Sequence, residues 1–466
     1  MEFSGKLAAQ ALNEGDEVVL VFNSKMAEYI KRKYFPKSVK VISKVDWLVK
    51  NYKKDQKAFK NIFWKDFFPT FERKHNLLNL NYENSKDIVS QLYQFFDFLF
   101  KDENPDIVVN EAPANIFTNI AYHFCEKYNK NYLGFIGSRF DDKIDIYDKK
   151  HTCSLYKKTF EDLTDDNILK TEKQFAENFI KDFISHKKLL SYMDFQASLS
   201  SSTGFLRYLK REVKMMPYWS KYVLNHLHFG KFDYESETGF KYKLFYPVRS
   251  IIRKFRSAFF NKKFDYLSDD DEFFLYPLHF HPEASTLVQA TYFSDQLNTI
   301  KNIAFSLPFP YKLYVKEHPA SVGTRPANFY KEIRKLPNAV LISPEENVEN
   351  LVKKSTGVVT LTSTIGIEAA LAGKRVYVLG DVFYTYHPLC VKVTGFEDLR
   401  QKIDDDAAIN KSIENLKEKN IRFVLSYFKN TVSGSILDAS KKEDTNNYPQ
   451  IYRYIKNMFF KINEQN

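Results

Sequence analysis

The 466-residue sequence predicts an α/β protein with two doubly wound, Rossmann-like domains that face each other across a cleft, and a helical, basic insertion. Three observations predict this fold. The chain is longer than one hydrophobic core usually organises. Short β-branched runs alternate with helical patterns in both halves, which is typical of βαβ units. Between residues 150 and 265 this alternation stops, and the sequence becomes helical, basic and aromatic.

These patterns divide the chain into four expected segments. Residues 1–150 would form the first Rossmann-like domain and residues 151–265 the insertion. Residues 266–437 would form the second Rossmann-like domain. Residues 438–466 would be a linker and an aromatic C-terminal helix that packs back on the first domain.

The first half opens with a helix, although a doubly wound domain normally opens with a strand. Ser85 is the expected N-cap of a later helix, in which Ile88, Leu92, Phe95 and Leu99 recur at helical spacing. The expected elements of this half are helices over residues 4–13, 85–99 and 114–128, and strands over 17–22, 106–110 and 132–136.

The second half has the clearer alternation. Phe293, Leu297, Ile300 and Ala304 form one apolar stripe and predict an amphipathic helix. The expected strands cover residues 274–280, 312–316, 339–342, 358–361 and 376–379, and a final helix covers 451–460.

Composition limits the class of protein. The sequence contains no run of about 18 uncharged apolar residues, so it predicts no transmembrane helix. The N-terminus lacks the basic and then apolar pattern of a signal peptide, so we expect a cytoplasmic protein. Cys125, Cys153 and Cys390 lie far apart and form no C-x-x-C pair, which fits a reducing compartment and gives no zinc signature.

Positive charge is concentrated in the insertion. Residues 205–263 hold 14 Lys and Arg against 4 Asp and Glu, interleaved with aromatic side chains. This mixture suits an anionic membrane surface, so we expect a protein peripheral on the inner face of the cytoplasmic membrane. A solvated basic face is the alternative interpretation. No nucleic-acid recognition motif accompanies the charge, so we expect no nucleic-acid partner.

Two motifs of the second domain predict an anion site. The expected strand over 312–316 leads into His318 and Pro319, and the strand over 358–361 leads into Thr362, Ser363 and Thr364 at a helix start. Ligands of parallel sheets bind where strands end, and helix N-termini favour anions. We therefore expect these residues to hold a nucleotide phosphate, although a local hydrogen bond of the histidine and an ordinary Ser/Thr N-cap are the alternatives. One turn into that helix, Glu368 would accept ribose hydroxyls.

The segment YPLHFHPEASTL contributes further polar residues at a strand end. It places His279, His281 and Glu283 before a helix start at Ser285 and Thr286. A carboxylate beside a helix N-terminus stays ionised, as a nucleophile or base must. The paired histidines allow a metal site, but no third ligand is evident, so we expect no metal.

Three other positions complete the candidate site. Glu111 follows the expected strand over 106–110 and would act as base for an acceptor hydroxyl. Arg139 would hold a sugar carboxylate. Pairing with each other or helix capping is the alternative for both. Tyr384, Tyr386 and His387, with Pro388, would wall the donor pocket.

YPLHFHPEAST, YVKEHP and TSTIGIEAALAGKRVYVLG with its trailing YHP resemble capsule polysaccharide biosynthesis proteins. That family includes the retaining transferases of 3-deoxy-manno-octulosonic acid (Kdo), which have the two-domain GT-B fold. The resemblance covers residues 270–390, extends faintly to 105–140, and is absent from the insertion. The His-Pro and Ser/Thr motifs are also similar to those of bacterial sialyltransferases, which hold the phosphate of a CMP-sugar.

The resemblance implies roles for individual residues. His318 and Ser363 or Thr364 would contact the donor phosphate. Glu283 would stand where the Kdo transferases carry an aspartate followed by Ala-Ser, and here it follows His-Pro. This departure leaves the donor open between CMP-Kdo and another nucleotide sugar.

The sequence thus predicts a metal-independent glycosyltransferase without a cofactor. Residues 266–437 would bind the nucleotide sugar, with His318 neutralising the leaving phosphate, and residues 1–150 would bind a lipid-linked or growing glycan. A nucleotide-sugar epimerase of the same fold and a non-enzymatic membrane-surface adaptor are the alternatives.

Overall fold

A computed structural model describes most of the chain and divides it into two compact units. The described residues are 2–54, 62–69, 81–140, 142–185, 213, 221, 223–234, 252–253, 255–256, 264–409, 414–436, 439 and 444–464. The first unit comprises Met1–Lys150, Ser198–Pro247 and Thr431–Asn466, and the second comprises His151–Ala197 and Val248–Asn430. The range 151–265, which sequence patterns group as one insertion, is therefore shared between the two units, and most of its basic part lies outside the described residues.

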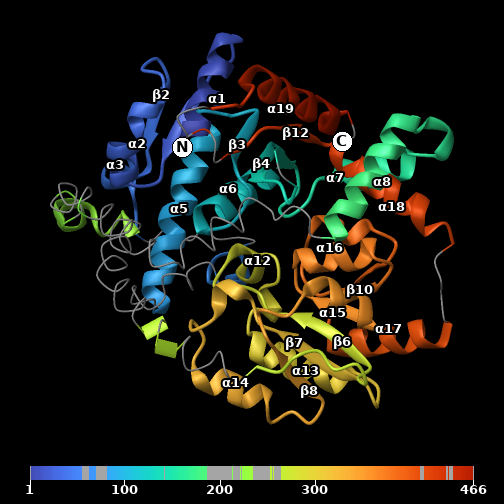
Figure 1. Cartoon of the computed structure of the whole chain (residues 1–466). Coiled ribbons are helices and arrows are strands. Elements are labelled where there is room, and N and C mark those ends of the chain that lie inside the picture. Colours follow the sequence, from blue (N-terminus) through green and yellow to red (C-terminus); the bar gives the residue numbers. More distant parts are fainter. Residues whose placement is uncertain are drawn as a thin grey trace. The chain divides into compact units, whose positions relative to one another are not determined.

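The second unit is built on a six-stranded, wholly parallel sheet with the order β11-β10-β9-β6-β7-β8. Figure 1 labels four of its strands, β6, β7, β8 and β10. Its strands are β6 (Phe273–Pro277), β7 (Lys312–Lys316), β8 (Ala339–Ile342), β9 (Gly357–Thr360), β10 (Arg375–Val378) and β11 (Cys390–Lys392). The chain proceeds outward from β6 to β8, returns to β9 on the other side of β6, and proceeds outward again. This is the doubly wound 3-2-1-4-5-6 order, and its switch point lies between β6 and β9.

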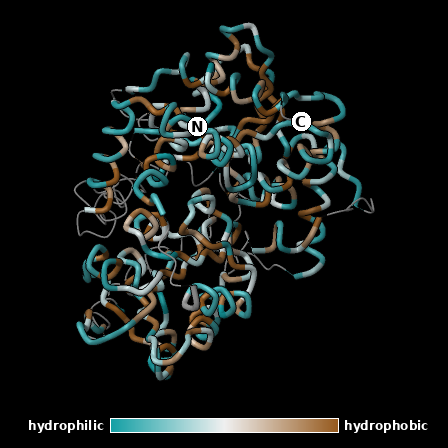
Figure 2. The backbone as a smooth tube through the Cα atoms, turned by 90° about the vertical axis from the view of Figure 1, so that its right-hand side faces the viewer, coloured by the Kyte–Doolittle hydropathy of each residue, from teal (hydrophilic) through white to brown (hydrophobic). Residues whose placement is uncertain are grey.

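Helices cover both faces of this sheet because its strands are buried apolar runs. α13 (Gln296–Ser306) contacts α14 (Ala327–Ile333) and α17 (Phe396–Ile409), and α15 (Val348–Lys354) contacts α16 (Thr364–Leu371). A further group, α7 (Ser154–Asp162), α8 (Lys170–Ile184) and α18 (Leu416–Lys429), packs together, with α18 against both α7 and α8. Short apolar stretches alternate with polar ones along the backbone (Figure 2).

The first unit is also α/β, but its described strands form two sheets. β1 (Val19–Phe22) pairs in parallel with β2 (Lys40–Ser43). The second sheet has the order β12-β5-β4-β3, in which only β3 (Ile107–Glu111) and β4 (Asn131–Gly137) are parallel. β5 (Lys143–Tyr147) and β12 (Thr431–Ser433) add antiparallel pairs. The α/β class is confirmed, and this unit departs from a single doubly wound sheet because residues from the far end of the chain complete it.

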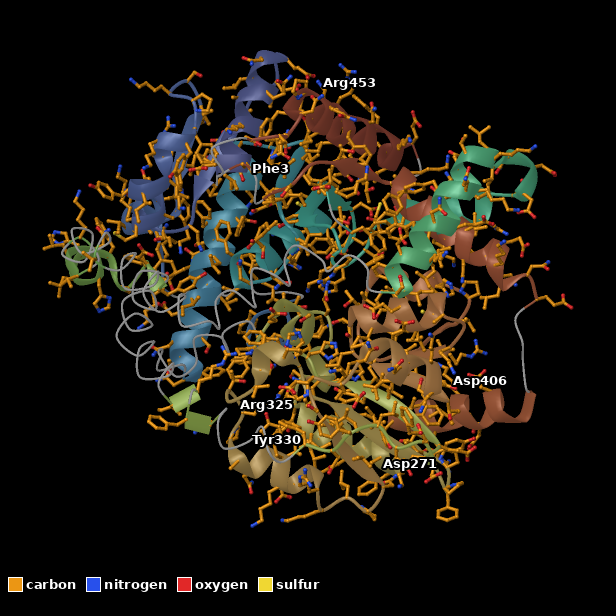
Figure 3. All side chains as sticks on the ribbon, viewed as in Figure 1. Phe3, Asp271, Arg325, Tyr330, Asp406 and Arg453 are labelled. Carbon is orange, nitrogen blue, oxygen red and sulfur yellow. The ribbon has the colours of Figure 1, made fainter. Side chains whose placement is uncertain are left out.

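Four helices of the first unit lie close to predicted positions: α1 (Glu2–Asn13), α5 (Tyr82–Asp102), α6 (Ile116–Lys127) and α19 (Tyr448–Asn463). The structure adds three helices that were not predicted, α2 (Lys25–Lys31), α3 (Lys44–Asn51) and α4 (Trp64–Phe67). α19 packs against α1, where Lys456 Nζ lies 3.0 Å from a carboxylate oxygen of Asp16. Phe3 of α1 and Arg453 of α19 are labelled in Figure 3.

Two predicted element starts were wrong. α5 is capped by Asn81, whose side chain accepts from the Asn84 amide at 2.9 Å, and Ser85 is a buried residue inside the helix. Phe293 belongs to a separate 3-10 turn, because the Asp295 side chain caps α13 by accepting from its first amides. Apolar periodicity does not show where a polar cap interrupts the helix.

Candidate functional site

The loops that follow β6, β7 and β9 share one edge of the six-stranded sheet. β6 pairs with both β7 and β9, and all three strands are parallel. The Thr362 amide donates to His279 Nε2 at 3.0 Å, and the Thr362 hydroxyl donates to the Ser285 carbonyl at 3.1 Å. On the other side, the rings of Phe280 and His318 lie 6.2 Å apart. The loops after β7 and β9 thus flank the loop after β6, at the switch point of the sheet.

His318 presents a defined nitrogen at this edge. It caps the 3-10 helix η6 (Pro319–Ser321), and its Nδ1 accepts from the Ala320 amide at 3.1 Å. Burial, with help from the nearby charges of Arg325 and Lys316, lowers the pKa of His318 to about 4. The imidazole is therefore neutral at pH 7, and because Nδ1 accepts, its proton sits on Nε2. With this pKa, His318 offers a hydrogen-bond donor in place of a positive charge, and its expected contact with a phosphate stays a prediction.

The start of α16 is the second polar element of the edge. Ser363 is its N-cap, and the Ser363 hydroxyl accepts from the Ile365 amide at 3.2 Å. Ser363 and Thr364 are partly exposed. A Cβ on Gly366 would come within 2.6 Å of the Tyr384 hydroxyl, so this glycine makes room for a tyrosine of the protein. The helix dipole gives the start of α16 a partial positive charge beside the loop after β6. The amides of Ser363 and Ile365 there already donate to the hydroxyls of Thr360 and Ser363.

Glu283 lies between these two elements. It precedes the short helix α12 (Ala284–Leu287) and is partly exposed, and the Ser285 hydroxyl donates to its carboxylate at 3.2 Å. His281 Nδ1 lies 3.0 Å from the Thr286 hydroxyl, and the His281–Pro282 bond is cis. Among the residues that the structure describes, no three His, Cys, Asp or Glu side chains are grouped to hold a metal ion.

Several predicted donor contacts are instead internal contacts of the fold. The Thr362 hydroxyl bonds the Ser285 carbonyl, and Glu368 is only 9% exposed. The Tyr384 hydroxyl donates to the Ser363 carbonyl at 2.6 Å, so it supports the α16 start from behind. Tyr386 places its hydroxyl 3.0 Å from the Ser426 hydroxyl of α18. The sequence shows that these residues follow a strand but not which way they turn.

His387 also belongs to the interior. It is 1% exposed, its Nδ1 accepts from the Leu389 amide at 3.1 Å, and its Nε2 lies 2.9 Å from the Asn420 side-chain oxygen. Asn420 in turn donates to the Leu371 carbonyl at 2.9 Å, at the end of α16. His387 therefore joins α18 to α16, and its predicted place in a donor pocket was wrong.

This burial makes stability depend on pH. It lowers the pKa of His387 to about 4, as at His318. Between pH 6.5 and 4, His387 is protonated in the unfolded chain but stays neutral in the folded chain. The stability that is present above this pH window is therefore lost as the pH falls through it. We expect His387→Gln to remove roughly 2 kcal/mol of the loss between neutral pH and about pH 5. Urea unfolding at both pH values measures this, with exposed His226→Gln as control; equal losses in wild type and His387→Gln would contradict it.

A buried ion pair behind His318 was not predicted from the sequence. Glu317 is 1% exposed, and its carboxylate accepts from Arg325 Nε at 3.1 Å and from the Tyr330 hydroxyl at 2.6 Å. It also accepts from the His318 amide at 2.7 Å, and Arg325 donates to the His279 carbonyl at 2.6 Å. Arg325 and Tyr330 are labelled in Figure 3. This Glu317 cluster ties the loops after β6 and β7 together.

Lys316 makes a similar tie to β8. Its ammonium donates to the Pro344 carbonyl at 2.9 Å and lies 3.4 Å from the Ser343 carbonyl. Burial lowers the pKa of Lys316 to about 8, while Glu346 and Glu317 oppose the shift. The charged residues at the carboxyl end of β7, Lys316 and Glu317, thus hold neighbouring loops in place.

In the first unit, Glu111 and Arg139 lie at one edge of the four-stranded sheet. Glu111 ends β3 and is exposed, and its carboxylate accepts from the Asn115 side chain at 2.9 Å. Arg139 comes two residues after the parallel strand β4 and is partly exposed. Both positions leave polar atoms near solvent at the carboxyl ends of parallel strands.

Comparison with known proteins adds the family. A model described as capsule polysaccharide biosynthesis protein matches residues 169–409, just over half of the chain. The chain belongs to the capsule polysaccharide biosynthesis protein family. The matched residues include the loops after β6, β7 and β9, so the family is matched through the edge described above. None of the described helices is long and apolar enough to cross a membrane.

Solved structures resemble this family member weakly, and no curated protein matches its sequence. The Thermosulfurimonas dismutans KpsC beta Kdo 2,7 transferase is 12% identical over 95% of this chain and 99% of its own, with a TM-score of 0.38. The beta Kdo 2,4 transferase of the same protein is 13% identical over 66% and 75%, with a TM-score of 0.33. The UDP-GlcNAc 2-epimerase of Neisseria meningitidis is 12% identical over 91% and 96%, with a TM-score of 0.24. The family assignment rests on the matched model.

Proposed function

We propose that this capsule family member is a glycosyltransferase. It moves a sugar from a nucleotide-activated donor, CMP-Kdo or another nucleotide sugar, to a lipid-linked or growing glycan during surface polysaccharide synthesis. The observation that carries the proposal is the sheet edge at the switch point, where His318 and the start of α16 flank Glu283 within the residues that match the family.

The donor phosphate would be held by neutral hydrogen-bond donors and a helix dipole. His318 Nε2–H and the positive end of the α16 dipole are the groups suited to it. Arg325 is already paired with the Glu317 carboxylate, so its charge is not available to the phosphate. Preorganised donors of this kind stabilise charge that develops on a leaving phosphate without a divalent cation.

The transfer breaks the bond between the donor sugar and the phosphate oxygen and forms a bond from the same sugar carbon to an acceptor oxygen. The acceptor hydroxyl gives up its proton to a base, for which Glu111 and Glu283 are the candidates. Arg139 would bind an acidic group of a sugar. Exposure of Glu111 and partial exposure of Glu283 and Arg139 support access to these groups.

Nucleotide binding tests this proposal most directly. We expect one of CMP, UDP, GDP and CDP to raise the melting temperature by several degrees when present at about 100 times its Kd, because a ligand that binds only the folded state stabilises it by about 2.7 kcal/mol. Binding and transfer should persist in EDTA. If no nucleotide shifts the melting temperature, the proposed site does not exist.

The proposed lipid-linked acceptor fits a location of the protein at the inner face of the cytoplasmic membrane. A lipid-linked glycan is presented there, and the basic and aromatic composition of residues 205–263 suits an anionic bilayer. An epimerase would convert a free nucleotide sugar without any acceptor. The protein is incubated with a sugar conjugate of the nucleotide that stabilises it, with and without a lipid-linked acceptor. A transferase forms product only with the acceptor, whereas an epimerase converts the nucleotide sugar without it.

A further inference from the structure

Three aliphatic side chains of the insertion are exposed along one short helical stretch. Residues 223–229 are helical, and Val223, Leu224 and Leu227 are 41%, 59% and 73% exposed. Leu227 lies four residues after Val223 and three after Leu224, so the three side chains share one face. We call this face the exposed stripe. Aliphatic side chains gathered in this way mark a surface that contacts another apolar phase.

The chain directly after the exposed stripe is fixed to the first unit. Asp233 is fully buried, and its carboxylate accepts from the Lys25 amide at 3.0 Å, at the start of α2. Tyr234 is 5% exposed, and Lys44 Nζ lies 4.7 Å from the centre of its ring. Residues 231–234 therefore form an anchor, and the exposed stripe leads into firmly packed structure.

Charge around the stripe is positive. Lys221 and Lys231 are exposed on either side of it, and Asp233, the carboxylate of this stretch, is buried. Lys221 Nζ lies 3.4 Å from the ring centre of Tyr29 on α2, a side chain that is itself 51% exposed. Ammonium groups and a tyrosine ring around aliphatic side chains match the headgroup and acyl layers of an anionic bilayer. A nucleic acid would match the charge but not the aliphatic side chains.

We propose that the exposed stripe inserts into the surface of an anionic bilayer, with Lys221, Lys231 and Tyr29 at the headgroups and residues 231–234 as the anchor. The inference deepens the proposed membrane location by naming the contact. It identifies apolar insertion as a second contribution beside electrostatic attraction. Binding therefore falls with salt but is not abolished by it.

Vesicle sedimentation tests the stripe. The full chain should bind vesicles of phosphatidylglycerol and phosphatidylcholine more tightly than vesicles of phosphatidylcholine alone. Replacing both Leu224→Ser and Leu227→Ser should weaken binding at least about tenfold, because each leucine loses its transfer from water. Phe305→Ser is the matched control, since Phe305 is 71% exposed but lies on α13 of the second unit.

The outcomes separate this inference from the proposed enzyme activity. Unchanged vesicle binding by the double leucine variant, or an equal loss in Phe305→Ser, would overturn it, as would binding to DNA or RNA in place of vesicles. Circular dichroism and melting temperature verify that each variant is folded. A chain that binds vesicles but no nucleotide contradicts the transferase alone, and a chain that binds nucleotide but no vesicles contradicts the membrane contact alone.

Discussion

Alanine at position 318 is expected to lower the rate of sugar transfer by about 10²–10³-fold, the usual cost of removing one preorganised donor to a developing charge. His318 Nε2–H is the neutral donor at the edge of the six-stranded sheet, because Nδ1 already accepts from the Ala320 amide. The loss should appear mainly in kcat if this hydrogen bond strengthens as the phosphate leaves. Steady-state kinetics with the donor found by nucleotide screening measures it.

Two variants control for folding. His318→Gln keeps a neutral N–H donor and should recover part of the lost rate. His387→Gln changes a histidine with the same lowered pKa, about 4, that contacts Asn420 instead of the sheet edge. It should lower the melting temperature and leave the rate per folded molecule close to wild type. Normal turnover by His318→Ala would contradict the proposed site.

The six-stranded sheet was predictable because the sequence patterns that indicate its strands are local. Residues 357–360 and 375–378 are buried strands, and the sequence shows each as a short β-branched run. The sites after these strands follow from the same pattern, since parallel strands place their carboxyl ends at one edge. The sequence therefore predicts His318, Ser363 and Glu283 at one edge of the sheet, and the parallel pairing of β6 with β7 and β9 places the loops that carry them at that edge.

The contacts that decide each side chain's role were not predictable, because they join distant parts of the chain. His387 turns to Asn420, which lies 33 residues later. β12 completes the four-stranded sheet of the first unit from beyond residue 430, so the architecture of that unit could not be predicted from the first half of the sequence. Arg325 gave no signal at all: a single arginine in a turn does not reveal that Glu317 lies buried beside it.

Methionine at position 325 is expected to destabilise the second unit by about 3–5 kcal/mol, because the Glu317 carboxylate would remain buried without its cation. Arg325 and Glu317 are 9% and 1% exposed, so water cannot replace the lost partner easily. Urea unfolding measures the loss. Lys331→Met removes the same charge from an exposed position on α14 and should change stability by less than about 0.5 kcal/mol.

A second substitution distinguishes the ion pair from simple packing. Glu317→Gln combined with Arg325→Met removes both charges and should regain most of the stability, because the uncompensated carboxylate is gone. Arg325 also helps to hold the pKa of His318 near 4, so both variants should raise that pKa towards its ordinary value. An NMR titration of the His318 ring, assigned with His318→Gln, reports this shift independently of catalysis. An unchanged His318 titration would show that the Glu317 cluster supports the loops without setting the protonation of the donor histidine.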